Sequence, residues 1–259
     1  MTDLAIRPSM SPAPAPGTRP APVLPLSRSP ALLLPLAAFL PRSRANGPGL
    51  RSVLWVQGCP LRCAGCFNPQ FQPFSGGRPT PVQAVVDRIL ACEDTEGVTF
   101  SGGEPLAHAP VLAVVAERVR SAGKSVMVFT GYEAGMVLRS DRPDWRRLLA
   151  ATDLLIAGPY RQDRPSRHPW LGSSNQEVVF LTDRYGPEDV AAARRRAEFR
   201  IDRTGRLTVT GFPPPERQGG TTGEGESGRM GQGENGRTRR ASDAMPVAGR
   251  FNARSRSES

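Results

Sequence analysis

Three of the four cysteines of this 259-residue chain lie within eight residues, and this spacing constrains the fold more than any other feature of the sequence. Cys59, Cys63 and Cys66 belong to the segment GCPLRCAGCF, residues 58–67, which places all three on one tight loop. Three thiolates on one loop can bind three irons of a four-iron, four-sulfur cluster, whose complete ligation normally takes four cysteines. The spacing therefore predicts a cluster with one iron left open for a substrate.

Zinc is the alternative metal for closely spaced cysteines. Structural zinc sites are tetrahedral and usually use two separated cysteine pairs, or cysteine together with histidine. The chain has no second Cys-x-x-Cys segment, and its two histidines, His108 and His168, lie far downstream. The fourth cysteine, Cys92, ends an apolar, helix-like stretch, where a cysteine is more often a small buried side chain than a ligand. The spacing favours a cluster and leaves zinc as the second interpretation.

A glycine pair followed by a glutamate forms a second candidate motif. The segment GVTFSGGEPL, residues 97–106, is typical of a short buried strand that runs into Gly102, Gly103 and Glu104. Glycines let the backbone come close to a ligand, and parallel sheets bind ligands at the carboxyl ends of their strands. An ordinary strand-to-helix turn explains this segment equally well by itself. Its occurrence together with the cysteine loop favours one shared site.

These two motifs resemble those of the radical S-adenosylmethionine superfamily, whose hallmark is Cys-x3-Cys-x2-Cys followed by a Gly-Gly-Glu segment after the second strand. Within that superfamily the chain is similar to the small activating enzymes of anaerobic (class III) ribonucleotide reductases, over about residues 33–213. Asn46 and Phe67 depart from this pattern, because such activases often carry Asp at the first position and Tyr or His at the second. The resemblance is carried by residues 46–51 (NGPGLR), 56–60 (VQGCP), 65–69 (GCFNP), 101–105 (SGGEP), 130–132 (TGY), 157–160 (AGPY) and 172–176 (GSSNQ).

The resemblance implies a cofactor pair and a set of site residues. In this superfamily the amino and carboxylate groups of S-adenosylmethionine chelate the open iron, and one electron from the reduced cluster breaks a carbon–sulfur bond to give a 5'-deoxyadenosyl radical. The protein supplies ligation, orientation and shielding. By resemblance, Cys59, Cys63 and Cys66 bind the 4Fe-4S cluster, Gly102, Gly103 and Glu104 line the methionine amino group, and Gly65, Cys66 and Phe67 border the adenosine. Thr130 is either part of the same pocket or a turn residue before Gly131.

Strand-like and helix-like segments alternate along the chain. This order predicts an α/β fold with a parallel sheet and right-handed crossovers. About 180 ordered residues are too few for a closed eight-unit barrel of about 250 residues, so we expect an open, partial (β/α) barrel of the radical SAM type. The expected strands are 33–40, 52–57, 98–101, 125–129, 153–157 and about 177–181, the expected helices are 81–92 with Thr80 as N-cap, 109–122 and about 144–151, and residues 198–210 are expected to form a hairpin around Thr204 and Gly205.

Composition separates one domain, residues 31–213, from two flanks. Residues 1–30 are rich in Pro and Ala, and residues 214–259 consist mostly of Gly, Arg, Glu and Ser with almost no aromatic side chains. Such segments cannot bury enough apolar area to offset the entropy of an ordered chain. We therefore expect both flanks to be disordered tails.

The net charge of +10 raises the question of nucleic acid binding. The densest basic run of the chain is residues 194–196. If this run is helical, it is more typical of a solvated helix face than of a nucleic acid binding strip. No aromatic side chains are interleaved with the basic residues for base stacking. Residues 31–40 are apolar but too short to span a bilayer, contain Pro35 and fit the first strand. An iron-sulfur cluster with free thiolates belongs in a reducing compartment. We expect a cytoplasmic protein that binds neither nucleic acid nor membrane.

The resemblance implies a macromolecular substrate. An open barrel without a sizeable insertion leaves a mouth through which a loop of a glycyl-radical reductase could reach the adenosine, and an external electron donor would reduce the cluster. His108 and His168 are predicted to be surface or loop histidines, because isolated histidines lack the partners that acid–base catalysis needs. Two other interpretations remain: a radical enzyme that acts on a small molecule or peptide, and a non-enzymatic zinc or iron-sulfur binding module.

Overall fold

The computed structural model describes residues 32–212 except residues 195, 202 and 206. The two expected tails, residues 1–30 and 214–259, lie outside the described residues, as do the end residues of the expected domain, 31 and 213. Among the described residues, no helix is long and apolar enough to cross a membrane.

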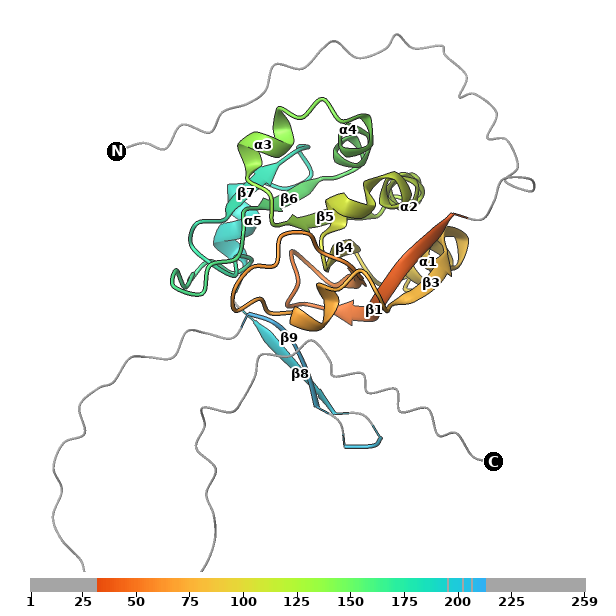
Figure 1. The fold of residues 1–259 in the computed structure, drawn as a ribbon, viewed down its shortest axis with the longest axis horizontal. Helices are drawn as coiled ribbons and strands as arrows, with labels where there is room; N and C mark the ends of the chain where they lie inside the picture. Colours follow the sequence, from red (N-terminus) through yellow and green to blue (C-terminus); the bar gives the residue numbers. More distant parts are fainter. Residues whose placement is uncertain (1–31, 195, 202, 206, 213–259) are drawn as a thin grey trace, which may run out of the picture. The chain divides into compact units, whose positions relative to one another are not determined.

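A seven-stranded sheet in the order β3-β1-β2-β4-β5-β6-β7 forms the centre of the described chain (Figure 1). Its four central strands, β2, β4, β5 and β6, run parallel to one another. The strands are β1 (Leu33–Ser43), β2 (Arg51–Val56), β3 (Arg78–Pro81), β4 (Gly97–Gly102), β5 (Ser125–Thr130), β6 (Leu154–Ala157) and β7 (Glu177–Phe180).

The prediction of a parallel sheet is therefore right for the centre and wrong at both edges. β1 pairs antiparallel with β2 and β3, and β7 pairs antiparallel with β6. A parallel pairing needs a long crossover, usually a helix, between the two strands. The connections between β1 and β2 and between β6 and β7 contain no helix, so these strands join the sheet antiparallel. The structure is a mixed α/β fold.

β3 was not predicted because two of its four residues are Pro79 and Pro81. Proline is tolerated in such a strand because β3 lies at the sheet edge, where one side needs no ladder hydrogen bonds. Thr80 belongs to this strand, and its hydroxyl donates to the carbonyl of Arg78 at 2.9 Å. The prediction of Thr80 as a helix N-cap is therefore wrong, since Pro81 occupies that position.

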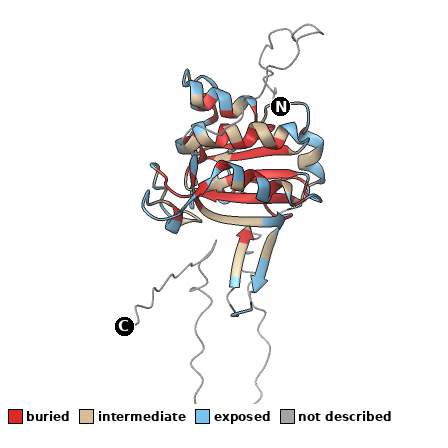
Figure 2. Cartoon of the chain, turned by 90° about the vertical axis from the view of Figure 1, so that its right-hand side faces the viewer, coloured by how far each residue is buried: buried red, intermediate tan, exposed pale blue. Residues whose placement is uncertain are grey.

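Helices cover the sheet where the sequence shows apolar side chains at helical spacing. In α1 (Val82–Leu90) the buried side chains are Val82, Val85, Val86 and Ile89, one face of the helix. They join one large core with the parallel strands (Figure 2). The other helices are α2 (Ala109–Ser121), α3 (Ala134–Leu138), α4 (Pro143–Ala150) and α5 (Pro187–Ala192), with 3-10 turns η1 (Pro69–Phe71) and η2 (Pro105–His108).

A separate two-stranded hairpin follows the sheet, as the sequence predicts. It consists of β8 (Ala197–Ile201) and β9 (Leu207–Gly211), which pair antiparallel with each other. The basic run at residues 194–196 leads from α5 into β8 and is not helical where it is described, because α5 ends at Ala192. The expected helical spacing of that run is therefore wrong, whereas its solvent exposure is right for Arg194 and Arg196, the two described residues of the run.

The amino ends of the parallel strands meet at a fully buried arginine. The Arg51 guanidinium donates to the hydroxyls of Thr99, Ser125 and Tyr185 and to the carbonyls of Pro48 and Val98 at 2.9–3.2 Å. A buried charge is tolerated when its donors are hydrogen-bonded. The Tyr185 hydroxyl also donates to a carboxylate oxygen of Glu96 at 2.6 Å.

Candidate functional site

The cysteine loop starts directly after β2 and is closed at its base by backbone hydrogen bonds. The N–H of Gly58 donates to the carbonyl of Phe71 at 2.8 Å, and the N–H of Cys59 donates to the carbonyl of Gln72 at 2.9 Å. The side-chain amide of Gln57 donates to two further carbonyls of the returning chain, those of Gln70 and Pro73. The three cysteines are thus held on a loop that both begins and ends beside the carboxyl end of β2.

The glycine pair packs directly against the start of that loop. The N–H of Gly103 donates to the carbonyl of Val56 at 2.7 Å, and the N–H of Glu104 donates to the carbonyl of Gly58 at 2.8 Å. A Cβ on Gly103 would collide with the Gly58 carbonyl, and a Cβ on Gly102, whose φ is +108°, would collide with the backbone of Val56. Glycine is therefore required here for the two motifs to come together.

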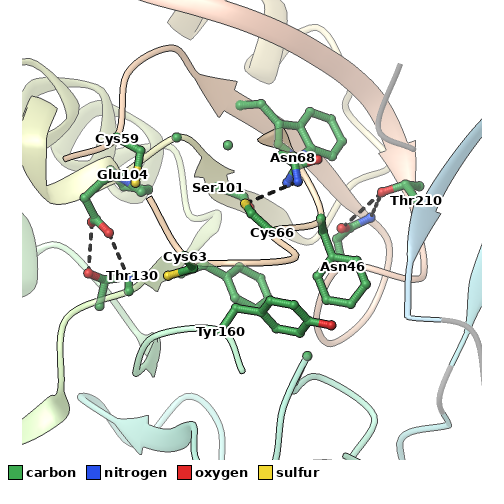
Figure 3. Close-up of a pocket in the computed structure, with 18 of the residues that line it drawn as sticks. Asn46, Cys59, Cys63, Cys66, Asn68, Ser101, Glu104, Thr130, Tyr160 and Thr210 are labelled. Carbon is green, nitrogen blue, oxygen red and sulfur yellow. Dashed lines mark hydrogen bonds between the residues drawn. The ribbon is translucent and has the colours of Figure 1, made fainter. Parts of the chain in front are cut away.

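A cavity of about 750 Å³ opens at the carboxyl ends of β2, β4 and β5, where open α/β sheets bind ligands (Figure 3). Its volume lies within the usual range for a small-molecule site. It brings together most of the residues that the sequence singles out: Cys59, Cys63, Cys66, Phe67, Gly102, Gly103, Glu104 and Thr130 all line it.

Gly65 is the exception, because it is not among the residues that line the cavity. Its φ is +68°, in the left-handed region that favours glycine, and a Cβ there would collide with the side chain of Gln162. The structure therefore places Gly65 in the turn of the loop, outside the lining of the cavity.

The three loop cysteines form no disulfide and differ in exposure. Cys59 is buried, whereas Cys63 and Cys66 are half-buried. Burial raises the pKa of the Cys59 thiol, while hydrogen bonds from the backbone of Leu61 and Arg62 lower it. Arg62 is the one non-glycine residue in the described chain with a positive φ, +48°, so the backbone that directs an N–H toward Cys59 is strained. The Cys66 sulfur accepts the N–H of Asn68 at 3.4 Å.

These features fit a cluster. Within the described residues, no three His, Cys, Asp or Glu side chains come together as ligands of one metal ion. A cluster does not require this, since its cysteines bind separate irons. A cluster requires thiols that are free of disulfides and face a shared space, and it is favoured by backbone N–H groups near the sulfurs. The cysteine loop has the free thiols along the cavity and an N–H, that of Asn68, at the Cys66 sulfur.

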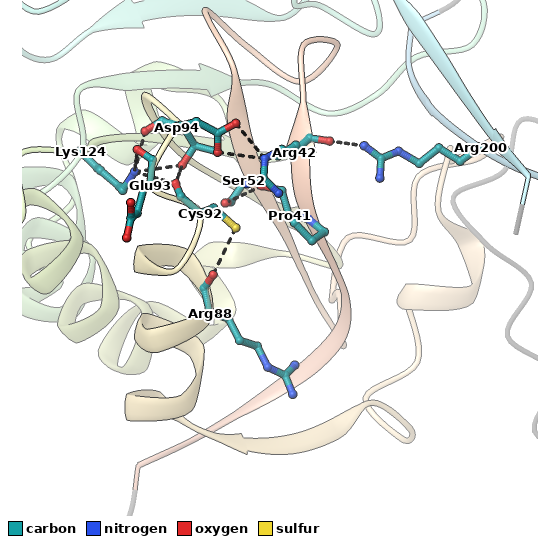
Figure 4. Close-up of polar contacts among 10 residues, drawn as sticks. Pro41, Arg42, Ser52, Arg88, Cys92, Glu93, Asp94, Lys124 and Arg200 are labelled. Carbon is teal, nitrogen blue, oxygen red and sulfur yellow. Dashed lines mark hydrogen bonds and ion pairs between the residues drawn. The ribbon is translucent and has the colours of Figure 1, made fainter.

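Cys92 lies elsewhere, as predicted for a buried cysteine. It is 6% exposed, follows α1, and donates its S–H to the carbonyl of Arg88 at 3.4 Å (Figure 4). It does not line the cavity.

Glu104 is a buried carboxylate with no cationic partner among the described residues. It accepts hydrogen bonds from the N–H of Leu106 and the hydroxyl of Thr130 on one oxygen and from the N–H of Gly131 on the other, all at 2.8–2.9 Å. Burial raises its pKa to about 7, although the hydrogen bonds act in the opposite direction. A buried, uncompensated negative charge that lines a cavity is well suited to bind a cationic group of a ligand.

Known proteins combine the same elements. Residues 45–179 match a family model described as a 4Fe-4S single cluster domain. An anaerobic ribonucleoside-triphosphate reductase-activating protein of Pasteurella multocida (strain Pm70) is 34% identical over 155 residues, 56% of this chain and 96% of that protein. The protein of the same description from Escherichia coli (strain K12) is 31% identical over 55% of this chain and 96% of its own length. That from Enterobacteria phage T4 is 29% identical over 53% and 88%.

The chain belongs to this 4Fe-4S activating-protein family. The resemblance that the sequence motifs suggest is therefore confirmed, and an iron-sulfur cluster is the metal centre that this family membership supports.

The two residues that depart from the family pattern, Asn46 and Phe67, both line the cavity in this chain. The Asn46 amide donates to the hydroxyls of Ser43 and Thr210 at 2.8 and 3.0 Å, and its oxygen accepts from the Thr210 hydroxyl at 3.2 Å. The Phe67 ring packs against Tyr160, with ring centroids 4.5 Å apart, and against Phe212 at 5.5 Å.

Sequence reasoning missed the apolar part of the cavity wall. Tyr160 and Phe212 line the cavity, as do Phe199 and Leu207 of the hairpin. Tyr160 belongs to the segment AGPY that carries the family resemblance, so a signal for it was present. No signal in the sequence indicates that a hairpin beyond residue 196 returns to the cysteine loop.

The two histidines differ from each other. His108 ends η2, is half-buried, and its Nε2 lies 2.8 Å from the carbonyl oxygen of Gln57; burial lowers its pKa. The prediction of a surface or loop histidine holds only in part for His108, because it is partly buried and ends a short 3-10 turn. It is right for His168, a loop residue whose Nδ1 accepts the N–H of Trp170 at 3.1 Å. Trp55, in β2, is buried in the core and also borders the cavity.

Proposed function

We propose that this chain is a radical S-adenosylmethionine enzyme that activates an anaerobic ribonucleoside-triphosphate reductase by generating a glycyl radical on it. The observation that carries the proposal is the cavity shared by three free cysteines and the buried Glu104, which has no cationic partner among the described residues. The descriptions of the relatives support the choice of partner.

Cys59, Cys63 and Cys66 would hold a 4Fe-4S cluster with one open iron. When bound, such a cluster would supply the one electron needed for reductive cleavage of S-adenosylmethionine to methionine and a 5'-deoxyadenosyl radical, the species that would take a hydrogen atom from the partner's glycine. The chain's own thiols must be deprotonated to bind iron. The Leu61 and Arg62 backbone favours the Cys59 thiolate against the cost of burial.

Glu104 would accept a hydrogen bond from an N–H of the amino group of S-adenosylmethionine, whose nitrogen as a neutral amine keeps its lone pair for the open iron. Thr130, Gly131 and Leu106 fix the orientation of the carboxylate, so little entropy is lost when the ligand binds. Gly102 and Gly103 bring the backbone of β4 close enough for this group and the cysteine loop to share one ligand.

Phe67, beside Cys66, would border the adenosine. Its ring, packed against Tyr160, forms an apolar wall of the cavity. The resemblance assigns Gly65 to the adenosine side of the site as well. Gly65 would contribute there by allowing the cysteine loop to turn at a positive φ.

We further propose that the sheet is the open, partial barrel of radical SAM enzymes and that residues 31–213 form the catalytic domain. The parallel strands and the cavity at their carboxyl ends support this. The enzyme would be cytoplasmic, where its free thiols remain reduced, and would take its electron from an external donor.

The test is anaerobic reconstitution with iron and sulfide, reduction with dithionite, and assay for 5'-deoxyadenosine. The proposal predicts that this product forms, and that a glycyl radical signal appears by electron paramagnetic resonance when the anaerobic reductase of the same organism is added. Cys63→Ser should abolish both, whereas Cys92→Ser, a matched change outside the cavity, should abolish neither.

Each failure has a separate meaning. Bound zinc without product would support the non-enzymatic module. Product without radical transfer to the reductase would support an enzyme that acts on a small molecule or peptide.

A further inference from the structure

The hairpin β8–β9 has one polar face and one apolar face. Side chains alternate between the two faces of a strand, and residues paired across strands share a face. The pairs Ala197–Gly211, Phe199–Val209 and Ile201–Leu207 form one face, which is entirely apolar. The pairs Glu198–Thr210 and Arg200–Thr208 form the other, which is polar.

The polar face holds the hairpin to the end of β1 and to the connection between β1 and β2. A carboxylate oxygen of Glu198 accepts the N–H of Arg44 at 2.6 Å, and Thr210 accepts from the Asn46 amide at 3.0 Å (Figure 3). The Arg200 guanidinium donates to the carbonyl of Arg42 (Figure 4). These contacts fix which face of the hairpin remains free.

The apolar face is exposed and continuous with the cavity. Ile201 is 74% exposed, Phe199 66% and Leu207 51%, and they lie together on two neighbouring strands. Phe199, Leu207 and Val209 also line the cavity beside the cysteines. Adjacent exposed apolar side chains on a folded protein mark an interaction site.

The hairpin lies outside the residues, 45–179, that match the 4Fe-4S family model. It is therefore not part of the segment that matches the 4Fe-4S domain model. In this chain it nevertheless forms one wall of the proposed site.

We propose that the apolar face of the hairpin is the docking surface for the reductase segment that carries the glycine, a proposal that rests on the proposed function. The occupant must be a segment that enters the cavity, because the exposed face and the cavity wall share the same side chains. It is expected to be extended and largely apolar. β8 and β9 pair only with each other in the described chain, so such a segment can also add as a strand to an open edge.

The test compares Ile201→Asp with Thr208→Asp in the reconstituted enzyme. Both place the same charge on the hairpin, the first on the apolar face and the second on the polar face, and neither residue lines the cavity. Ile201→Asp is expected to weaken the Kd for the anaerobic reductase of the same organism by about tenfold or more, since it would bury an unpaired charge at the interface. Thr208→Asp should change it by less than about threefold.

Two activities separate this proposal from the proposed function. Cleavage of S-adenosylmethionine with dithionite, without reductase, should be the same in wild type and Ile201→Asp, whereas glycyl radical yield at subsaturating reductase should fall with the affinity. If wild type does not cleave S-adenosylmethionine, the proposed function fails. If it does, and Ile201→Asp binds and activates the reductase as wild type does, the docking proposal fails.

Two further measurements keep the result interpretable. Ile201→Thr retains a β-branched side chain and should show a smaller loss in the same direction, even if Ile201→Asp folds poorly. Size-exclusion chromatography without reductase tests a second copy of the chain as the occupant. A wild-type dimer that becomes monomeric in Ile201→Asp would overturn the proposal in favour of self-association.

Discussion

At the scale of single residues, Glu104 and Gly103 show how the site combines charge and close packing. Glu104 keeps a carboxylate in a buried place where only neutral groups donate to it. Gly103 allows β4 to approach the cysteine loop more closely than any other residue would. Each residue leads to a prediction that does not require the partner protein.

Glu104 should make stability depend on pH. Its pKa is raised from 4.5 to about 7 by burial, so the folded protein binds the proton more tightly than the unfolded chain. Stability is then highest below about pH 4.5 and is lost as pH rises through 7, by about 3 kcal/mol for this group. Urea unfolding between pH 4.5 and 8, without S-adenosylmethionine, should show this loss in wild type, and Glu104→Gln should remove it.

The partly exposed Glu117, paired with Arg147, provides the control. Glu117→Gln should keep the pH dependence of wild type. An unchanged pH dependence in Glu104→Gln would show that Glu104 is not the group responsible.

Gly103→Ala should displace the cysteine loop. The added methyl would meet the backbone carbonyls of Gly58 and Phe71, which cannot move without opening the base of the loop. We expect a loss of about 1–3 kcal/mol in stability, typical of overpacking, and a lower iron content after reconstitution. Gly135→Ala in α3 is the control, because its methyl would meet only the flexible end of Arg139. Equal iron contents in the two variants would contradict this role of Gly103.

At the scale of elements, the carboxyl end of α1 is fixed by the one lysine of the chain. The Lys124 ammonium donates to the carbonyls of Cys92 and Thr95 at 2.9 and 2.6 Å (Figure 4). A cation at this end of a helix also interacts favourably with the helix dipole. The ammonium thereby joins α1 to the start of β5.

Lys124→Met should therefore destabilise the protein by about 1–3 kcal/mol, the usual range for hydrogen bonds to a charged group. Denaturant unfolding measures the loss. Arg88→Met, which removes an exposed cation from α1 itself, should cost less than about 0.5 kcal/mol. Similar losses in both variants would indicate a general charge effect instead of a specific contact.

At the scale of the whole described chain, the sheet has a structural end and a functional end. The buried Arg51 links β2, β4 and β5 to Tyr185 at the amino ends of the parallel strands. The cavity lies at their carboxyl ends. This separation allows substitutions at one end to be tested for effects at the other.

Arg51→Met should cost about 3–5 kcal/mol, because it leaves several buried polar groups without their partner. Cluster loading and cleavage of S-adenosylmethionine in the folded fraction should stay close to wild type. Tyr185→Phe, which removes one hydroxyl of the same network, should cost less. Thermal unfolding and iron content together distinguish this from direct damage to the cluster site.

The sequence by itself determined the features that depend on neighbours along the chain. The cysteine spacing, the glycine pair with Glu104, the apolar faces of α1 and α2 and the hairpin turn are short-range patterns, and the structure contains each of them. Only the tertiary structure decided the antiparallel edges, the proline-containing β3, the burial that raises the pKa of Glu104, and the position of Gly65 outside the cavity. It also decided that the hairpin lines the cavity. These features depend on which distant segments pack together. That packing is set by the free energy of the whole chain, so no short stretch of the sequence indicates it.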